Sequence, residues 1–87
     1  MDTGVLAAIR LLPRHKKDVE ELARSSEEFR GLCRDLADAE LVLDRLEKSG
    51  VPDTAARRVE YRSLIDGLEA ELRQAVQEKQ LSGHRQN

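Results

Sequence analysis

Apolar residues recur at alternating steps of three and four along the middle of the chain. In the first such stretch the apolar positions are Phe29, Leu32, Leu36, Ala39, Leu43 and Leu46. Residues at this spacing line one face of an α-helix and form the seam of coiled coils, so we expect a helix over about residues 26–48. Ser25 and Glu28 match a capping box, in which the serine hydroxyl accepts the Glu28 amide, and they predict where this helix starts.

A second stretch with the same spacing follows a short break. Its apolar positions are Tyr61, Ile65, Leu68, Leu72 and Ala75. The break contains Gly50, which suits the left-handed position after a helix end, and Pro52, which suits the first turn of the next helix. We therefore expect an all-α fold: an antiparallel, coiled-coil-like helical hairpin over residues 25–80, with helices spanning about 26–48 and 52–80.

The segments on either side of the hairpin differ in character. Residues 1–24 contain spaced apolar positions and predict a helical arm with a kink or break near Pro13, because the residue before a proline is biased away from helix. Whether this arm is one kinked helix or two short ones stays open. The apolar pattern fades near Gln80, and we expect residues 81–87 to form a flexible polar tail.

A second set of apolar positions lies outside the seam. Its members are Val5, Ile9, Leu12, Val19, Leu22, Ala37, Leu41 and Val42. A bare two-helix hairpin buries little apolar surface for the chain entropy that it loses, so we expect this second surface to be covered. The arm could fold back on the hairpin as a third layer, or a second copy could pack against it. We favour a homodimer that forms a four-helix or larger bundle, with a self-contained three- or four-helix monomer as the alternative.

The composition argues against several classes of protein, among them nucleic-acid-binding, membrane-spanning and disulfide-stabilised proteins. Charged residues make up 37% of the 87 positions, yet the net charge is only -2, and this near balance argues against a nucleic-acid partner. The longest apolar run, residues 5–12, is far shorter than the ~20 residues that span a bilayer, and the start of the chain does not resemble a signal peptide. The single cysteine, Cys33, cannot form an intramolecular disulfide. We expect a cytoplasmic protein without a membrane span.

Several polar residues are of types that can form chemical sites, but an ordinary structural role explains each of them better. Cys33 is expected to be a small, semi-buried filler, because no histidine lies near it in the sequence. Tyr61 is expected to pack in the seam with its hydroxyl reaching water or a backbone group. The remaining candidates read as solvated helix faces: the basic residues 14–17, Arg57, Arg58 and Arg62, and the acidic residues Asp35, Asp38, Glu40 and Asp44. We expect no catalytic residue, cofactor, metal or small-molecule substrate.

The hairpin region also resembles a known group of proteins. The segment Glu28-Phe29-Arg30-Gly31-Leu32, a heptad helix ending in Leu46-Glu47-Lys48, a short turn and a second helix closing on Leu68-Glu69-Ala70-Glu71-Leu72 are similar to small uncharacterised bacterial helical-hairpin proteins, including the YdcH-like group. The resemblance covers about 50 residues and implies a hairpin that self-associates, without known catalysis. This chain has a longer second helix, no lysine-rich run and an additional apolar arm, and no functional residue is carried over.

Two functions follow from these observations. The first is a small non-catalytic interaction or adaptor protein that binds itself or another protein through its helix faces. The alternative is a weak nucleic-acid-binding or regulatory protein that uses residues 14–17 with Arg57 and Arg58. A redox sensor or enzyme built on Cys33 is the third and weakest hypothesis.

Overall fold

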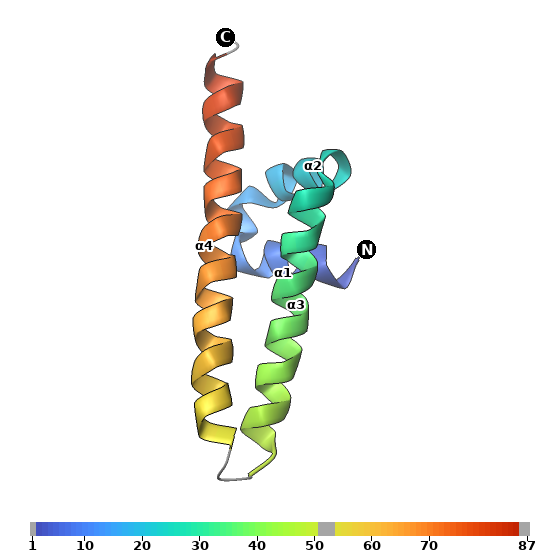
Figure 1. Cartoon of the computed structure of the whole chain (residues 1–87). Coiled ribbons are helices and arrows are strands. Elements are labelled where there is room, and N and C mark those ends of the chain that lie inside the picture. The colour runs from blue at the N-terminus through green and yellow to red at the C-terminus, as the bar shows by residue number, and fades with distance from the viewer. Residues whose placement is uncertain (1, 51–53, 86–87) are drawn as a thin grey trace.

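The computed structural model describes residues 2–50 and 54–85, and within these ranges the chain is helical without strands. Its elements are α1 (Thr3–Leu11), a short 3-10 turn η1 (Pro13–His15), α2 (Lys16–Ser25), α3 (Glu27–Lys48) and α4 (Ala55–Arg85). The molecule is elongated, 55 × 23 × 21 Å, with α3 and α4 side by side along its length (Figure 1). The predicted all-α fold is confirmed.

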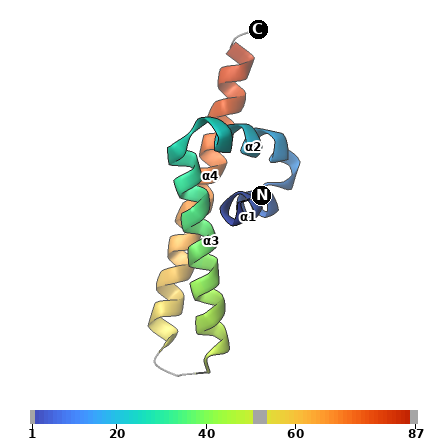
Figure 2. The ribbon, with the colours of Figure 1, turned by 90° about the vertical axis from the view of Figure 1, so that its right-hand side faces the viewer.

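The helices α3 and α4 run antiparallel and are joined at one end of the molecule (Figures 1 and 2). Gly50 has a φ of 68°, the left-handed conformation predicted for it after the end of α3. Pro52, predicted to start the next helix, lies outside the described residues. At its other end α4 continues to Arg85, so the expected end of the helix near Gln80 is wrong: a helix can continue through polar residues after its apolar pattern stops.

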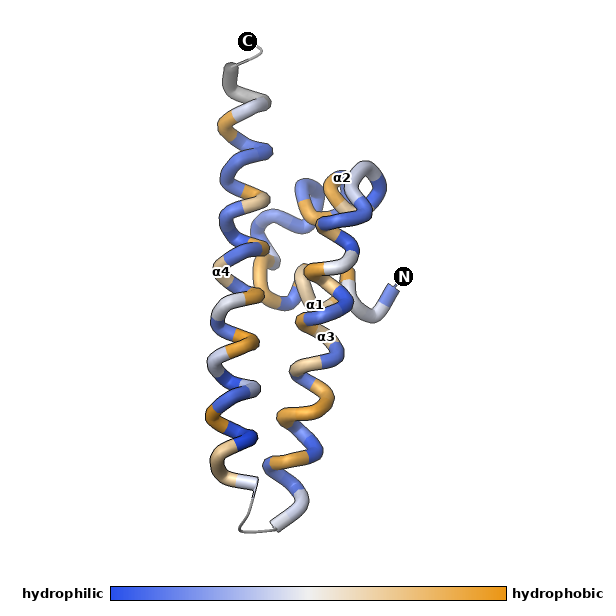
Figure 3. The backbone as a smooth tube through the Cα atoms, in the orientation of Figure 1, coloured by the Kyte–Doolittle hydropathy of each residue, from blue (hydrophilic) through white to orange (hydrophobic). Residues whose placement is uncertain are grey.

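The predicted seam forms most of the core between α3 and α4. Phe29, Leu36, Ala39, Ile65, Leu68 and Leu72 are buried, and Leu32, Leu43, Leu46, Tyr61 and Ala75 are half-buried. Val76 and Cys33, each one position past a seam residue, are also buried. Figure 3 shows hydrophobic positions recurring along both helices, and a mostly hydrophilic C-terminal part of α4.

The N-terminal arm consists of two separate helices. Leu12, with φ -125° and ψ 62°, ends α1, and Pro13 occupies the first position of the 3-10 turn that leads into α2. Figure 2 shows α1 to one side of the hairpin, where it packs on α3, and α2 running across the hairpin to the start of α3, in contact with both α3 and α4. Val5 and Val19 are part of the core. The prediction that these two residues belong to an interaction surface is therefore wrong. Around these two residues the arm forms a third layer on the hairpin of α3 and α4.

Gly4 allows α1 to approach α3 closely. A Cβ atom built on Gly4 would lie 2.8 Å from the backbone nitrogen of Arg34 and 2.9 Å from the carbonyl carbon of Cys33. Ala7 and Ala8, both buried, are the other small residues of this helix. The backbone amide of Gly4 donates to Asp2 Oδ1 at 2.9 Å, so Asp2 caps α1 at the same end.

The start of α3 differs from the predicted capping box by one residue. The cap is Ser26, whose hydroxyl accepts a hydrogen bond from the Phe29 amide at 3.1 Å. Ser25 instead ends α2 and donates its hydroxyl to the Glu21 carbonyl at 3.0 Å. Either of the two consecutive serines could cap α3. Because α2 continues through Ser25, only Ser26 has the extended backbone of a cap residue.

Candidate functional site

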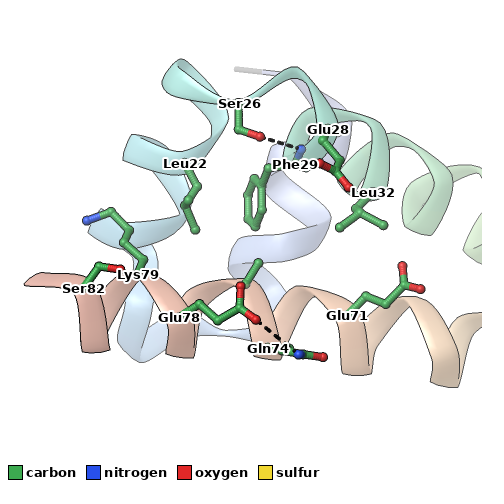
Figure 4. Close-up of a pocket in the computed structure, with 11 residues that line it drawn as sticks. Leu22, Ser26, Glu28, Phe29, Leu32, Glu71, Gln74, Glu78, Lys79 and Ser82 are labelled. Carbon is green, nitrogen blue, oxygen red and sulfur yellow. Dashed lines mark hydrogen bonds between the residues drawn. The ribbon is translucent and has the colours of Figure 1, made fainter.

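An apolar groove lies where α2 and the beginning of α3 face the C-terminal half of α4 (Figure 4). Its volume is about 600 Å³, enough to admit several side chains. The apolar residues that line it are Leu22 from α2, Phe29 and Leu32 from α3, and Ala75 from α4. Three seam residues and one arm residue predicted from the sequence therefore meet here. The groove itself had no signal in the sequence, because it forms between three helices.

The Ser26 cap helps to shape this groove. Its hydrogen bond to the Phe29 amide fixes the first turn of α3, and it separates α2 from α3 by one extended residue. The side chain of Arg30 donates to the Ala23 carbonyl and so ties α3 back to α2. Together these contacts hold Leu22 of α2 beside Phe29 (Figure 4).

The rim of the groove is acidic. Glu28 stands on the α3 side, and Glu71 and Glu78 stand on the α4 side (Figure 4). Gln74 donates to Glu78 Oε1 at 3.2 Å, and this contact leaves the charge of Glu78 in place. Among the described side chains, none of the three glutamates has an ion-pair partner. The groove therefore combines an apolar floor with uncompensated negative charge.

Lys79 lines the groove but directs its charge to α2. Its Nζ lies 2.7 Å from Glu21 Oε2 and 3.3 Å from Asp18 Oδ1. These contacts lower the pKa of Glu21, through the hydrogen bond and the charge of Lys79, and raise the pKa of Lys79. Gln80 adds hydrogen bonds to His15, at 2.9 Å, and to Asp18, at 3.3 Å. This polar cluster fastens α2 to α4 and leaves Lys79 unavailable to offset the acidic rim.

The groove belongs to a longer uncovered side of the hairpin, which we call the open face. On α4 it follows positions at steps of four and three: Arg57, Tyr61, Leu64, Leu68, Glu71, Ala75, Glu78 and Ser82. Leu68 itself is buried in the core, and the last four residues line the groove. Residues at this spacing lie on one side of a helix. By the same spacing Leu32, Val42 and Leu46 share a side of α3. α1 packs on the other side of α3, and α2 reaches the open face only at its groove end, so the rest of this face is uncovered (Figure 2).

The eight residues of the predicted second surface do not form one surface. Besides the buried Val5 and Val19, five are half-buried: Ile9, Leu12, Leu22, Ala37 and Val42. Leu41 is 51% exposed, and with Ala37 it lines a second hollow of about 480 Å³ beside α1. Leu41 and Val42 point to different sides of α3, because successive residues of a helix are about 100° apart. The structure thus divides the predicted set between the core, the second hollow and the open face.

The candidate acidic residues are scattered over α3. Asp44 accepts a hydrogen bond from Lys48 Nζ at 3.0 Å, and Glu40 lies 3.7 Å from Arg10 of α1. Asp35 and Asp38 are exposed. Within residues 2–50 and 54–85, no three histidine, cysteine, aspartate or glutamate side chains come together as metal ligands would.

Cys33 is fully buried under α1, deeper than the semi-buried position expected for it. Burial, together with the nearby Asp2 carboxylate, raises the pKa of the Cys33 thiol to about 11. Reactive cysteines have a lowered pKa and are accessible, and Cys33 has neither property. Its observed role is to fill the core.

The two basic clusters lie far apart. His15 is hydrogen-bonded to Gln80 near the C-terminal end of α4, whereas Arg57 and Arg58 stand near its beginning. A separation of about 23 residues at ~1.5 Å each puts some 35 Å between them. Arg58 donates to Thr54 at 2.7 Å, and Arg62 pairs with Glu47 of α3 at 3.0 Å. The structure does not join these residues into one basic patch.

Comparisons of the chain with family models, with curated proteins and with solved structures found no match. In the part of the chain that the structure describes, no helix combines the length and the apolar character needed to cross a membrane.

Proposed function

We propose that this protein is a small non-catalytic interaction protein that binds protein helices, including those of a second copy, through the open face of its hairpin. The groove lined by Leu22, Phe29, Leu32 and Ala75 is the observation that carries the proposal. Apolar grooves with polar rims are typical of surfaces that accept an amphipathic helix. The free thiol of Cys33 suits a reducing cytoplasm as the place where it acts.

Packing supports this proposal. Leu64 on the open face is 49% exposed, and the half-buried Leu32, Val42 and Leu46 lie on the same side of the hairpin. The arm reaches this side only at the groove, where Leu22 of α2 lies, so between the groove and the turn α3 and α4 alone form this side of the molecule. An additional helix laid along the open face would bury these side chains and complete a bundle of the usual kind.

Site-specific photo-cross-linking tests the proposal. A benzophenone amino acid replaces Glu71 in the groove, and in a matched variant it replaces Asp66, an exposed acidic residue five positions away on the same helix. Five residues rotate a helix by about 140°, so position 66 faces away from the groove. We expect protein adducts, with a second copy or with another protein, from position 71 and few from position 66. Equal yields at both positions, or adducts at neither, would refute the proposal.

A further inference from the structure

The open face has opposite chemistry at its two ends. Near the turn, α4 presents Arg57, Tyr61 and Leu64 on this face, and towards its C-terminus it presents Glu71 and Glu78 beside the apolar groove. One end therefore offers a cation, an aromatic ring and an exposed leucine. The other end offers carboxylates and an apolar hollow. The cation at one end is complementary to the carboxylates at the other, and the exposed leucine is complementary to the apolar hollow.

The charges at the two ends are free to pair. The neighbours Arg58 and Arg62 are engaged with Thr54 and Glu47, but Arg57 has no ion-pair partner among the described side chains. The same holds for Glu78 at the other end, which accepts a hydrogen bond from the neutral amide of Gln74. A partner that brings the opposite charge would therefore gain contacts without breaking existing ion pairs.

We propose that a second copy of this chain occupies the open face in antiparallel orientation, which would specify the partner in the proposed function on which this inference rests. A two-fold axis near Leu68, close to the midpoint of Arg57 and Glu78, places Arg57 of each copy beside Glu78 of the other. The same axis brings Leu64 of each copy towards the groove of the other. A parallel pair would instead set the carboxylates of Glu71 and Glu78 against their own copies.

Cross-linking through introduced cysteines tests the orientation. The variants are Arg57→Cys, Glu78→Cys and the double variant, treated with a short bismaleimide, with the wild type as control for the buried Cys33. In the antiparallel dimer the two copies of position 57 lie about 30 Å apart, whereas packed helices are only ~8–10 Å apart. We expect covalent dimers from the double variant and not from either single variant. Dimers from the single variants would overturn the antiparallel arrangement.

Charge reversal tests the same pair in the equilibrium between monomer and dimer. Sedimentation should show a dimer that is weakened about tenfold by Arg57→Glu and by Glu78→Arg, because each change puts two like-charged pairs into the dimer. Combining the two changes should restore wild-type affinity. A double variant that is as weak as either single variant would overturn the proposal.

Two exposed apolar residues of α4 provide a matched control. Leu64 lies on the open face and Val59, 65% exposed, points to another side of the helix. Leu64→Glu should abolish dimerisation at micromolar concentration, and Val59→Glu should leave it unchanged. A chain that stays monomeric in every form would overturn the inference. Adducts of position 71 with a different protein would in that case still support the proposed function.

Discussion

Replacing Gly4 by alanine tests how α1 is held against the hairpin. A Cβ atom at this position would meet the Arg34 nitrogen at 2.8 Å, the Cys33 carbonyl carbon at 2.9 Å and the Arg34 Cα at 3.0 Å. All three are backbone atoms within α3, and they cannot rotate away as a flexible side chain could. Gly4→Ala must therefore push α1 outwards and loosen the buried contacts of Val5 and Ala8.

Two opposing effects set the magnitude. Alanine favours helix over glycine by about 0.5–1 kcal/mol, and overpacking a tight contact costs about 1–3 kcal/mol. We expect Gly4→Ala to lower the free energy of unfolding by about 1–2 kcal/mol. Gly31 and Gly67 are helical glycines with nothing within 4 Å of the added Cβ, so the same substitution there should stabilise the protein by up to ~1 kcal/mol.

Urea unfolding followed by circular dichroism measures all three variants under the same conditions. With a urea m-value of about 1–3 kcal/mol/M, a change of about 1 kcal/mol shifts the unfolding midpoint by about 0.3–1 M, so opposite signs are easily resolved. Hydrogen exchange should also show faster exchange in α1 for Gly4→Ala and not for Gly67→Ala. If Gly4→Ala stabilises the chain as much as Gly67→Ala does, α1 does not pack against α3 as closely as described.

Three further predictions follow from individual contacts. Ser26→Ala should cost about 1 kcal/mol in urea unfolding and Ser25→Ala much less, because Ser26 caps α3; equal losses would contradict the cap. Cys33 should react with a thiol reagent at mildly alkaline pH only after unfolding, since its pKa is about 11, and rapid reaction of the native protein would contradict its burial. The pKa of Glu21 is lowered by its pairing with Lys79, so the stabilisation from this pair is present above pH 4.5, the ordinary pKa, and is lost as the pH falls. The pKa of Lys79 is raised, so its stabilisation is present below pH 10.5, the ordinary pKa, and is lost as the pH rises. Lys79→Gln should therefore reduce the fall of Tm at both extremes of pH, and an unchanged pH profile would refute this pairing.

The hairpin was predictable because its determinants are local. Steps of three and four put Leu36 and Leu72 on helix faces that have to be buried, and both are fully buried. Gly50 after Lys48 indicated where the first helix ends, and the backbone has the positive φ that favours glycine there. These features depend on a few neighbouring residues, so no knowledge of the tertiary structure was needed.

The position of the arm was not predictable in the same way. The apolar character of Val5 and Val19 indicates that they need cover, but their spacing is equally compatible with a dimer contact and with the core of a monomer. Gly4 carried a signal that the spacing rules do not use: a glycine at the start of a helix suggests close approach of another backbone. Only the fold shows that this backbone is α3 at Cys33 and Arg34.

The open face depends on that placement. Along the sequence Glu71 and Glu78 look like any charged residues on a solvated helix, and Leu64 looks like a residue that widens the seam. Once α1 occupies one side of α3, the same three residues share the side that remains uncovered, next to a groove lined by Phe29 and Ala75. The arm therefore does more than complete the core. By covering one side of the hairpin, the arm determines which side is left for a partner. A change that displaces α1 should expose the apolar side of α3 as a second surface, so that a partner no longer binds the open face alone.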